Sequence, residues 1–103
     1  RVWRALRLQE AHRYAAADSL WRRGPFRPPA SWPRAWRQHL DLQQTAWAGV
    51  AAYRAGRVEA AAATLSAAAR RAAAHGATTW AETLRFWAAR ARWAAAPTGR
   101  PAN

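Results

Sequence analysis

The sequence contains no cysteine, lysine, isoleucine or methionine, and only five of its 103 residues are acidic. The absence of cysteine excludes disulfides, thiolate chemistry and zinc–thiolate sites, and it fits a reducing compartment. The longest stretch without a charged residue, 42–53, is far shorter than the roughly 20 apolar residues of a membrane-spanning helix. We therefore expect a soluble chain in a reducing intracellular compartment, either the cytoplasm or an organelle matrix.

All 17 basic residues are arginine, and they give the chain a formal net charge of +12. Such an excess favours an acidic partner, which can be nucleic acid, an anionic lipid surface or an acidic protein. Few groups are suited to catalysis, because there are only three histidines and the sequence has no glycine-rich phosphate loop or His-x-x-x-His pair. We expect no enzymatic activity, no metal site, no cofactor and no small-molecule substrate.

Alanine dominates the apolar residues, with 31 alanines against seven leucines and three valines. Alanine is the strongest helix former and allows helices to approach closely. The large apolar area must then come from the eight tryptophans, each of which can bury about 200 Å². The composition predicts one all-α domain over residues 1–96, and the proline-containing segment 97–103 is expected to be a flexible tail.

Four helices are predicted, and they cover 2–23, 31–55, 58–75 and 79–96. Ser31 is the expected N-cap of the second helix, and Thr79 opens a capping box at the start of the fourth. Gly56 separates the second and third helices, which indicates a tight antiparallel pair. The inner stripe of the second helix is predicted to be Trp36, Leu40, Gln43, Trp47 and Val50, followed by Tyr53 or Arg54. The stripe of the third helix is predicted to be Val58, Ala61, Leu65, Ala68 and Ala72.

The fourth predicted helix carries two aromatic stripes. The first stripe consists of Trp80, Leu84, Trp87 and Ala91. Phe86 and Trp93 form the second, which is rotated from the first by about 100°. The first stripe can pack on the preceding helix pair, whereas the second needs to be covered by the first helix or by a partner. Phe86, Arg90 and Trp93 are therefore predicted to dock a protein partner.

Residues 24–33 contain four of the six prolines and should form an extended strap between the first two helices. The strap is either a plain spacer or a docking element, and Phe26 and Trp32 are the candidates to hold it against the helices. Arginines and aromatic residues alternate around it, at Arg22, Arg23, Phe26, Arg27, Trp32, Arg34, Trp36 and Arg37. Arginine binds phosphates and carboxylates, and aromatic rings stack on unpaired bases, so this cluster is the candidate surface for RNA or an acidic partner. Alternatively, the arginines are solvated and the tryptophans fill the core.

Small residues, a turn glycine and larger apolar residues recur within residues 45–69, at Gly49, Gly56, Val58, Ala61, Leu65 and Ala68. With this spacing, the segment resembles one tetratricopeptide-type repeat. The resemblance implies stacked antiparallel helical hairpins and an interaction scaffold without catalytic residues. A second set, Asp18-Ser19-Leu20-Trp21, Gln43-Gln44 and Gly56, is similar to a small all-helical domain family of unknown function, although Tyr14 stands where that family has histidine.

These observations predict a non-catalytic helical adaptor or assembly subunit of a larger complex, with other protein subunits as its partners. The alternative is an RNA-contacting accessory subunit of a ribonucleoprotein such as a ribosome. A peripheral role at a membrane surface is the third possibility.

Overall fold

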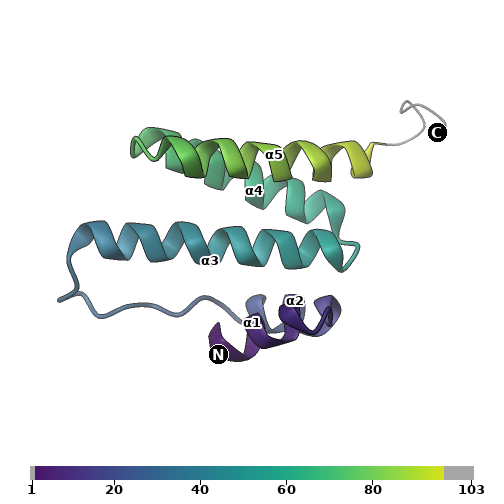
Figure 1. The fold of residues 1–103 in the computed structure, drawn as a ribbon, viewed down its shortest axis with the longest axis horizontal. Helices are drawn as coiled ribbons and strands as arrows, with labels where there is room; N and C mark the ends of the chain where they lie inside the picture. Colours follow the sequence, from purple (N-terminus) through teal and green to yellow (C-terminus); the bar gives the residue numbers. More distant parts are fainter. Residues whose placement is uncertain (1, 97–103) are drawn as a thin grey trace.

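Five α-helices and no strands make up residues 2–96, the part of the chain that the computed structural model describes (Figure 1). The helices are α1 (Val2–Glu10), α2 (Tyr14–Trp21), α3 (Arg34–Arg54), α4 (Val58–Ala74) and α5 (Thr78–Ala95). The prediction of an all-α fold is confirmed. Residue 1 and the predicted tail, 97–103, lie outside the described residues. No helix within residues 2–96 is long and apolar enough to cross a membrane.

Three of the helix connections use the same tight turn. At the α3–α4 turn, the N–H of Gly56 donates to the carbonyl of Tyr53 at 3.1 Å, and the N–H of Arg57 donates to that of Ala52 at 2.9 Å. These are the two hydrogen bonds of a Schellman motif, in which the residue after the helix adopts a positive φ. His12 and Gly76 occupy the equivalent position in the α1–α2 and α4–α5 turns, with φ values of 59° and 74°.

The prediction of a single helix over residues 2–23 is wrong, because the chain turns at His12. A positive φ is common for glycine but costly for other residues, so histidine gives no sequence signal of a helix end. The N–H of His12 nevertheless donates to the carbonyl of Gln9, and that of Arg13 to Leu8, which completes the motif. Residues 2–96 therefore form five helices, whereas the sequence predicted four.

Two predicted helix caps are also wrong. The helix expected from Ser31 begins at Arg34, with Pro33 as its N-cap and no side-chain cap. A residue before proline avoids the helical conformation, so Trp32 cannot belong to the helix. The helix expected from Thr79 begins at Thr78, because the turn at Gly76 places Ala77 at the N-cap, again without a side-chain hydrogen bond.

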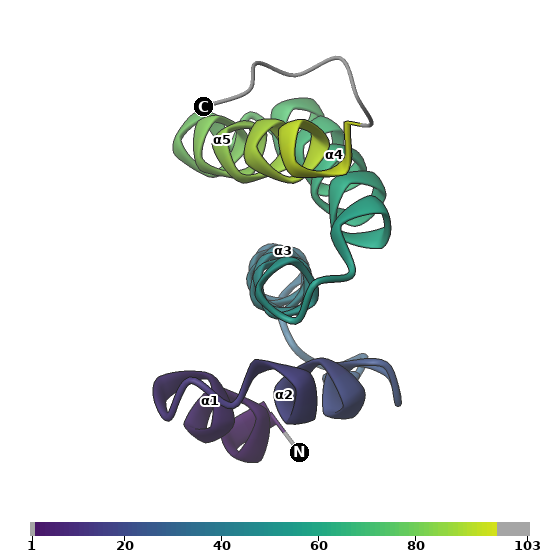
Figure 2. The same cartoon turned by 90° about the vertical axis from the view of Figure 1, so that its right-hand side faces the viewer.

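The helices form three tiers, with α3 alone between the α1–α2 pair and the α4–α5 pair (Figure 2). One buried cluster joins α3, α4 and α5 around Leu65 and Leu84. A second, smaller cluster joins α1, α2 and α3 around Trp21 and consists otherwise of Ala5, Ala17 and Ala51. A Cβ atom built on Gly49 would lie 2.5 Å from a methyl carbon of Leu65, so α3 and α4 approach each other as closely as glycine allows.

The middle position of α3 explains why its predicted inner stripe is wrong. The buried residues of this helix are Leu42, Gln44, Ala46, Gly49, Ala51 and Ala52. They belong to two faces, one against α4 and one against α1 and α2. The residues of the predicted stripe are half-buried at best, and Trp36 at its start is 65% exposed. In contrast, α4 buries the predicted Ala61, Leu65, Ala68 and Ala72, while Val58 is half-buried.

Hydrogen-bonded polar side chains tie α2 to its neighbours. Asp18 is buried on α2 and accepts a hydrogen bond from Nη1 of Arg57, in the α3–α4 turn, at 2.7 Å. Trp21, three residues further along the helix, donates from its indole nitrogen to Gln9 of α1 at 2.7 Å. The first bond holds α2 against the α3–α4 turn and the second joins α2 to α1, and together they position the start of the α2–α3 connection, residues 22–33.

Candidate functional site

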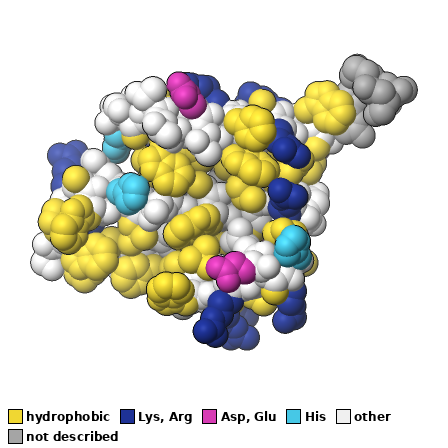
Figure 3. All heavy atoms as spheres, in the orientation of Figure 1, with side chains coloured by type: hydrophobic (Ala, Val, Ile, Leu, Met, Phe, Trp, Pro, Cys, Tyr) yellow, Lys and Arg dark blue, Asp and Glu magenta, His cyan; other side chains and the backbone are white. Residues whose placement is uncertain are grey.

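An open groove of about 850 Å³ lies between α1, the α2–α3 connection and α3. We call it the aromatic groove, and its lining residues are Val2, Trp3, Leu6, Arg23, Gly24, Pro25, Phe26, Arg27, Trp32, Leu40 and Trp47. Four residues of the predicted Arg/aromatic cluster therefore come together here, namely Arg23, Phe26, Arg27 and Trp32. Hydrophobic side chains, yellow in Figure 3, also gather over one face of the molecule, from the upper helices to the lower left, where the connection lies in Figure 1.

The groove has a firm floor and exposed aromatic walls. Its floor includes Trp47, which is half-buried and packs against Trp21 with ring centroids 6.3 Å apart. On the walls, Trp3, Phe26 and Trp32 are 79%, 45% and 38% exposed. The rings of Phe26 and Trp32 lie 6.3 Å apart and support each other. Apolar rings of this size held at a surface are typical of binding sites.

Gln44 holds the connection in place. Its side-chain amide is buried on α3, accepts from the backbone N–H of Phe26 at 2.8 Å and donates to the carbonyl of the same residue at 2.9 Å. The sequence predicted that the Phe26 and Trp32 side chains would hold this segment. Instead, the backbone of Phe26 is bound, and its ring is left free to line the groove.

Positive charge rims the groove. Arg23 and Arg27 line it, and its lining includes no acidic residue. Among residues 2–96, ion pairs form only between Arg57 and Asp18 and between Arg71 and Asp41. The rim arginines therefore have no carboxylate partner within the described part of the chain.

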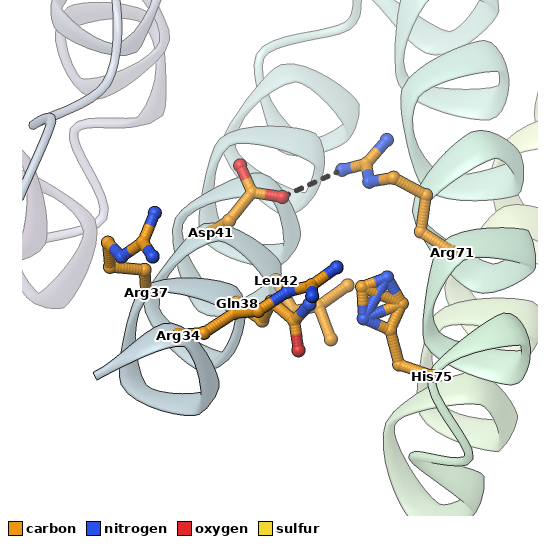
Figure 4. Close-up of a pocket in the computed structure, with 7 residues that line it drawn as sticks. All are labelled: Arg34, Arg37, Gln38, Asp41, Leu42, Arg71 and His75. Carbon is orange, nitrogen blue, oxygen red and sulfur yellow. Dashed lines mark ion pairs between the residues drawn. The ribbon is translucent and has the colours of Figure 1, made fainter. Parts of the chain in front are cut away.

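Two other arginines of the predicted cluster, Arg34 and Arg37, line a separate crevice of about 260 Å³ between α3 and α4 (Figure 4). Its other lining residues are Gln38, Asp41, Leu42, Arg71 and His75. Nη2 of Arg71 lies 3.6 Å from the carboxylate of Asp41. Arg34 extends toward His75, whereas Arg37 points away from Arg71 and His75. Nε of Arg37 instead donates to the carbonyl of Trp32 at 3.1 Å. Arg22 and Trp36 line neither the groove nor this crevice.

Phe86, Arg90 and Trp93 line a shallow pocket of about 420 Å³ together with Tyr53 and Ala89. The guanidinium of Arg90 lies 5.8 Å from the ring centroid of Tyr53 and 5.6 Å from that of Phe86, within the range of cation–π attraction. Phe86 and Trp93 are 56% and 52% exposed. The first predicted helix does not cover them, because α1 and α2 pack on the opposite side of α3.

Sequence reasoning missed several groove residues. Trp3 was not among the predicted site residues, but it belongs to α1 and lines the groove. Gln44 was noted only as part of a family resemblance, and periodicity alone offers no signal that a glutamine binds a backbone 18 residues away.

The described residues place few reactive groups together. His12 lies against Tyr14, and His39 packs on Trp80, so these histidines make aromatic contacts on different parts of the fold. Within residues 2–96, no three His, Asp or Glu side chains gather in a way that could hold a metal ion. Comparisons with protein-family models, curated proteins and solved structures found no significant match.

Proposed function

We propose that this chain is a non-catalytic adaptor or assembly subunit that binds a protein partner in the aromatic groove. The observation that carries the proposal is the groove itself, in which Trp3, Phe26 and Trp32 stand exposed on a hydrogen-bonded frame. Aromatic residues and arginine are the side chains most enriched at protein interfaces and at their energetic centres.

The frame behind the groove fits an interaction scaffold. We propose that α3 and α4 correspond to a tetratricopeptide-like hairpin, which is supported by the close approach at Gly49 and the turn at Gly56. We further propose that the α2–α3 connection is a docking strap rather than a plain spacer. Its support is the pair of hydrogen bonds from Gln44, since a simple spacer needs no buried amide to fix its backbone.

Site-specific photo-crosslinking tests the proposal. A benzophenone amino acid is placed at Trp32, in the groove, or at Ala63, which is exposed on α4, and the full chain is irradiated in cells that naturally produce it. We expect a discrete protein adduct from position 32 and none of that mass from position 63. Adducts with nucleic acid alone, or the same adducts from both positions, would contradict the proposal.

RNA binding is the second candidate, and the α3–α4 crevice favours it. Arg34, Arg71 and His75 line this crevice with a single carboxylate, that of Asp41. If RNA binds here, the logarithm of the affinity for single-stranded RNA falls linearly with the logarithm of the salt concentration, by about 0.7 for each phosphate neutralised. The double substitution Arg34→Glu and Arg71→Glu should make that dependence shallower. Affinity that is independent of salt would exclude this function.

A further inference from the structure

We infer that the occupant of the aromatic groove is an amphipathic helix of a partner protein, whose apolar side chains enter the groove while its Asp and Glu residues face Arg23 and Arg27. This inference rests on the proposed function and specifies the chemistry of the partner. Three properties of the groove support it, namely the groups that line it, its apolar walls and its charge.

The first property is that the groove offers side chains rather than a backbone edge. Two walls are α-helices, α1 and α3, whose backbone groups bond within the helix. The third is the α2–α3 connection, where both backbone groups of Phe26 are taken by Gln44. No strand edge occurs in residues 2–96. An extended peptide would leave its own N–H and C=O groups without protein partners, whereas a helix satisfies them internally.

The second property is the apolar lining. Trp3 lines the groove from α1, Trp32 from the connection, and Leu40 and Trp47 from α3. The volume of about 850 Å³ accommodates several side chains at once. An amphipathic helix supplies such a row from positions i, i+3, i+4 and i+7 of one face.

The third property is the charge of the rim. Arg23 and Arg27 have no carboxylate partner in the described residues, so acidic residues beside the apolar face of the helix would complement them. The same charge disfavours a second copy of this chain as the occupant. Its exposed aromatic surface on α5 contains Arg90, and each copy carries a formal charge of +12.

Peptide display tests this inference without knowledge of the natural partner. A library of random peptides of about 20 residues, long enough to form a helix on binding, is selected on the full chain and counter-selected on the Trp3→Ala, Trp32→Ala double variant. Both tryptophans are exposed, so the variant should keep its helical circular dichroism. We expect the enriched peptides to combine apolar residues at helical spacing with Asp and Glu. Enrichment of basic or non-periodic peptides would overturn the inference. So would a selection in which no peptide binds the full chain better than the Trp3→Ala, Trp32→Ala variant.

Affinity measurements on the enriched peptide then locate the site. In fluorescence anisotropy, Trp3→Ala should weaken binding about 30-fold, the effect expected for an aromatic anchor. Trp36→Ala is the matched control, because Trp36 is exposed but lies outside the groove lining, and binding should stay within about twofold. Arg23→Glu with Arg27→Glu should weaken the acidic peptide at least tenfold and favour its Lys-substituted counterpart. Equal losses for Trp3 and Trp36, or no change of charge preference, would refute the assignment.

The two proposals fail in different ways. If photo-crosslinking at position 32 gives a protein adduct but display yields extended or basic peptides, the chain is an adaptor with a different occupant. If position 32 gives no protein adduct, the adaptor function itself is wrong. An oligonucleotide of single-stranded RNA that displaces the selected peptide from the groove would overturn the choice of a protein helix.

Discussion

Replacement of Gln44 by alanine should release the α2–α3 connection from α3. Its side chain makes two hydrogen bonds to the backbone of Phe26, at 2.8 and 2.9 Å, and the residue is only 3% exposed. Each such bond contributes about 1 kcal/mol net, and the buried methylene removed with the amide contributes about 0.8 kcal/mol. Gln44→Ala should therefore lower the free energy of unfolding by about 3 kcal/mol. This is a large part of the total, because a domain usually has a free energy of unfolding of about 5–15 kcal/mol.

Urea denaturation followed by circular dichroism measures this loss, and hydrogen exchange at the Phe26 amide reports its cause. That amide should exchange slowly in the original chain and rapidly in Gln44→Ala, because its acceptor is gone. Gln43→Ala is the matched control. Gln43 is a half-buried neighbour, and its side chain forms no hydrogen bond within residues 2–96. Its effect should stay within about 0.5 kcal/mol.

Gln44→Glu separates the two bonds. A glutamate keeps the acceptor for the N–H of Phe26 but cannot donate to its carbonyl when ionised, and it places a charge in a buried site. We expect this variant to be at least as destabilised as Gln44→Ala at neutral pH. The reasoning is refuted if Gln44→Ala is as mild as the Gln43 control, or if exchange at Phe26 is unchanged.

Three further predictions concern the frame, each measured by urea denaturation. Gly49→Ala should destabilise the chain by about 1 kcal/mol or more, because the new Cβ would lie 2.5 Å from a buried leucine methyl; a gain, as expected for an open helical glycine, would contradict this close contact. Arg57→Ala should cost about 3 kcal/mol and Asp18→Ala about 2 kcal/mol. The first loss is larger because it leaves the buried carboxylate of Asp18, 6% exposed, without its partner, whereas the side chain of Arg57 is 39% exposed. The reverse order would exclude the buried carboxylate as the cause. His12→Gly should stabilise the chain by about 0.5–1 kcal/mol and Gly56→Ala should destabilise it by about 1 kcal/mol, because both residues have a positive φ. A Cβ at Gly56 would meet no atom within 4 Å, so only the backbone conformation opposes alanine there. Effects of the same sign would disprove this backbone explanation.

The elements that could be predicted from the sequence are those marked by glycine or by a regular stripe of small residues. Gly56 and Gly76 end α3 and α4 where expected, because few other residues accept a positive φ. The buried face of α4 follows its alanine and leucine spacing. His12 makes the same turn without any such signal, so the number of helices could not be predicted correctly.

The candidate site was predictable only in part, because its pieces come from segments that no local pattern connects. Arg23, Phe26, Arg27 and Trp32 are close in sequence and remain close in space. Arg34 follows them in sequence, but it belongs to α3 and lines the crevice toward α4. Arg37 lines both that crevice and a pocket that it shares with Phe26 and Arg27. Trp36 illustrates a further limit, since a large apolar residue at helical spacing suggested the core and is mostly exposed. Periodicity gives the faces of a helix, whereas the choice of covered faces depends on its neighbours.

The two buried clusters share only one helix, α3, and this has a consequence for how the molecule opens. The cluster under α1 and α2 is built from three alanines and Trp21, whereas the one under α4 and α5 contains three buried leucines. We expect the α1–α2 half to unfold locally at a lower free energy than the α3–α5 half, which hydrogen exchange would show as two protection levels. Because α1 forms a wall of the aromatic groove, a ligand there stabilises the closed form of the weaker half. Binding would then be visible as slower exchange in α1 and α2, with little change in α4 and α5.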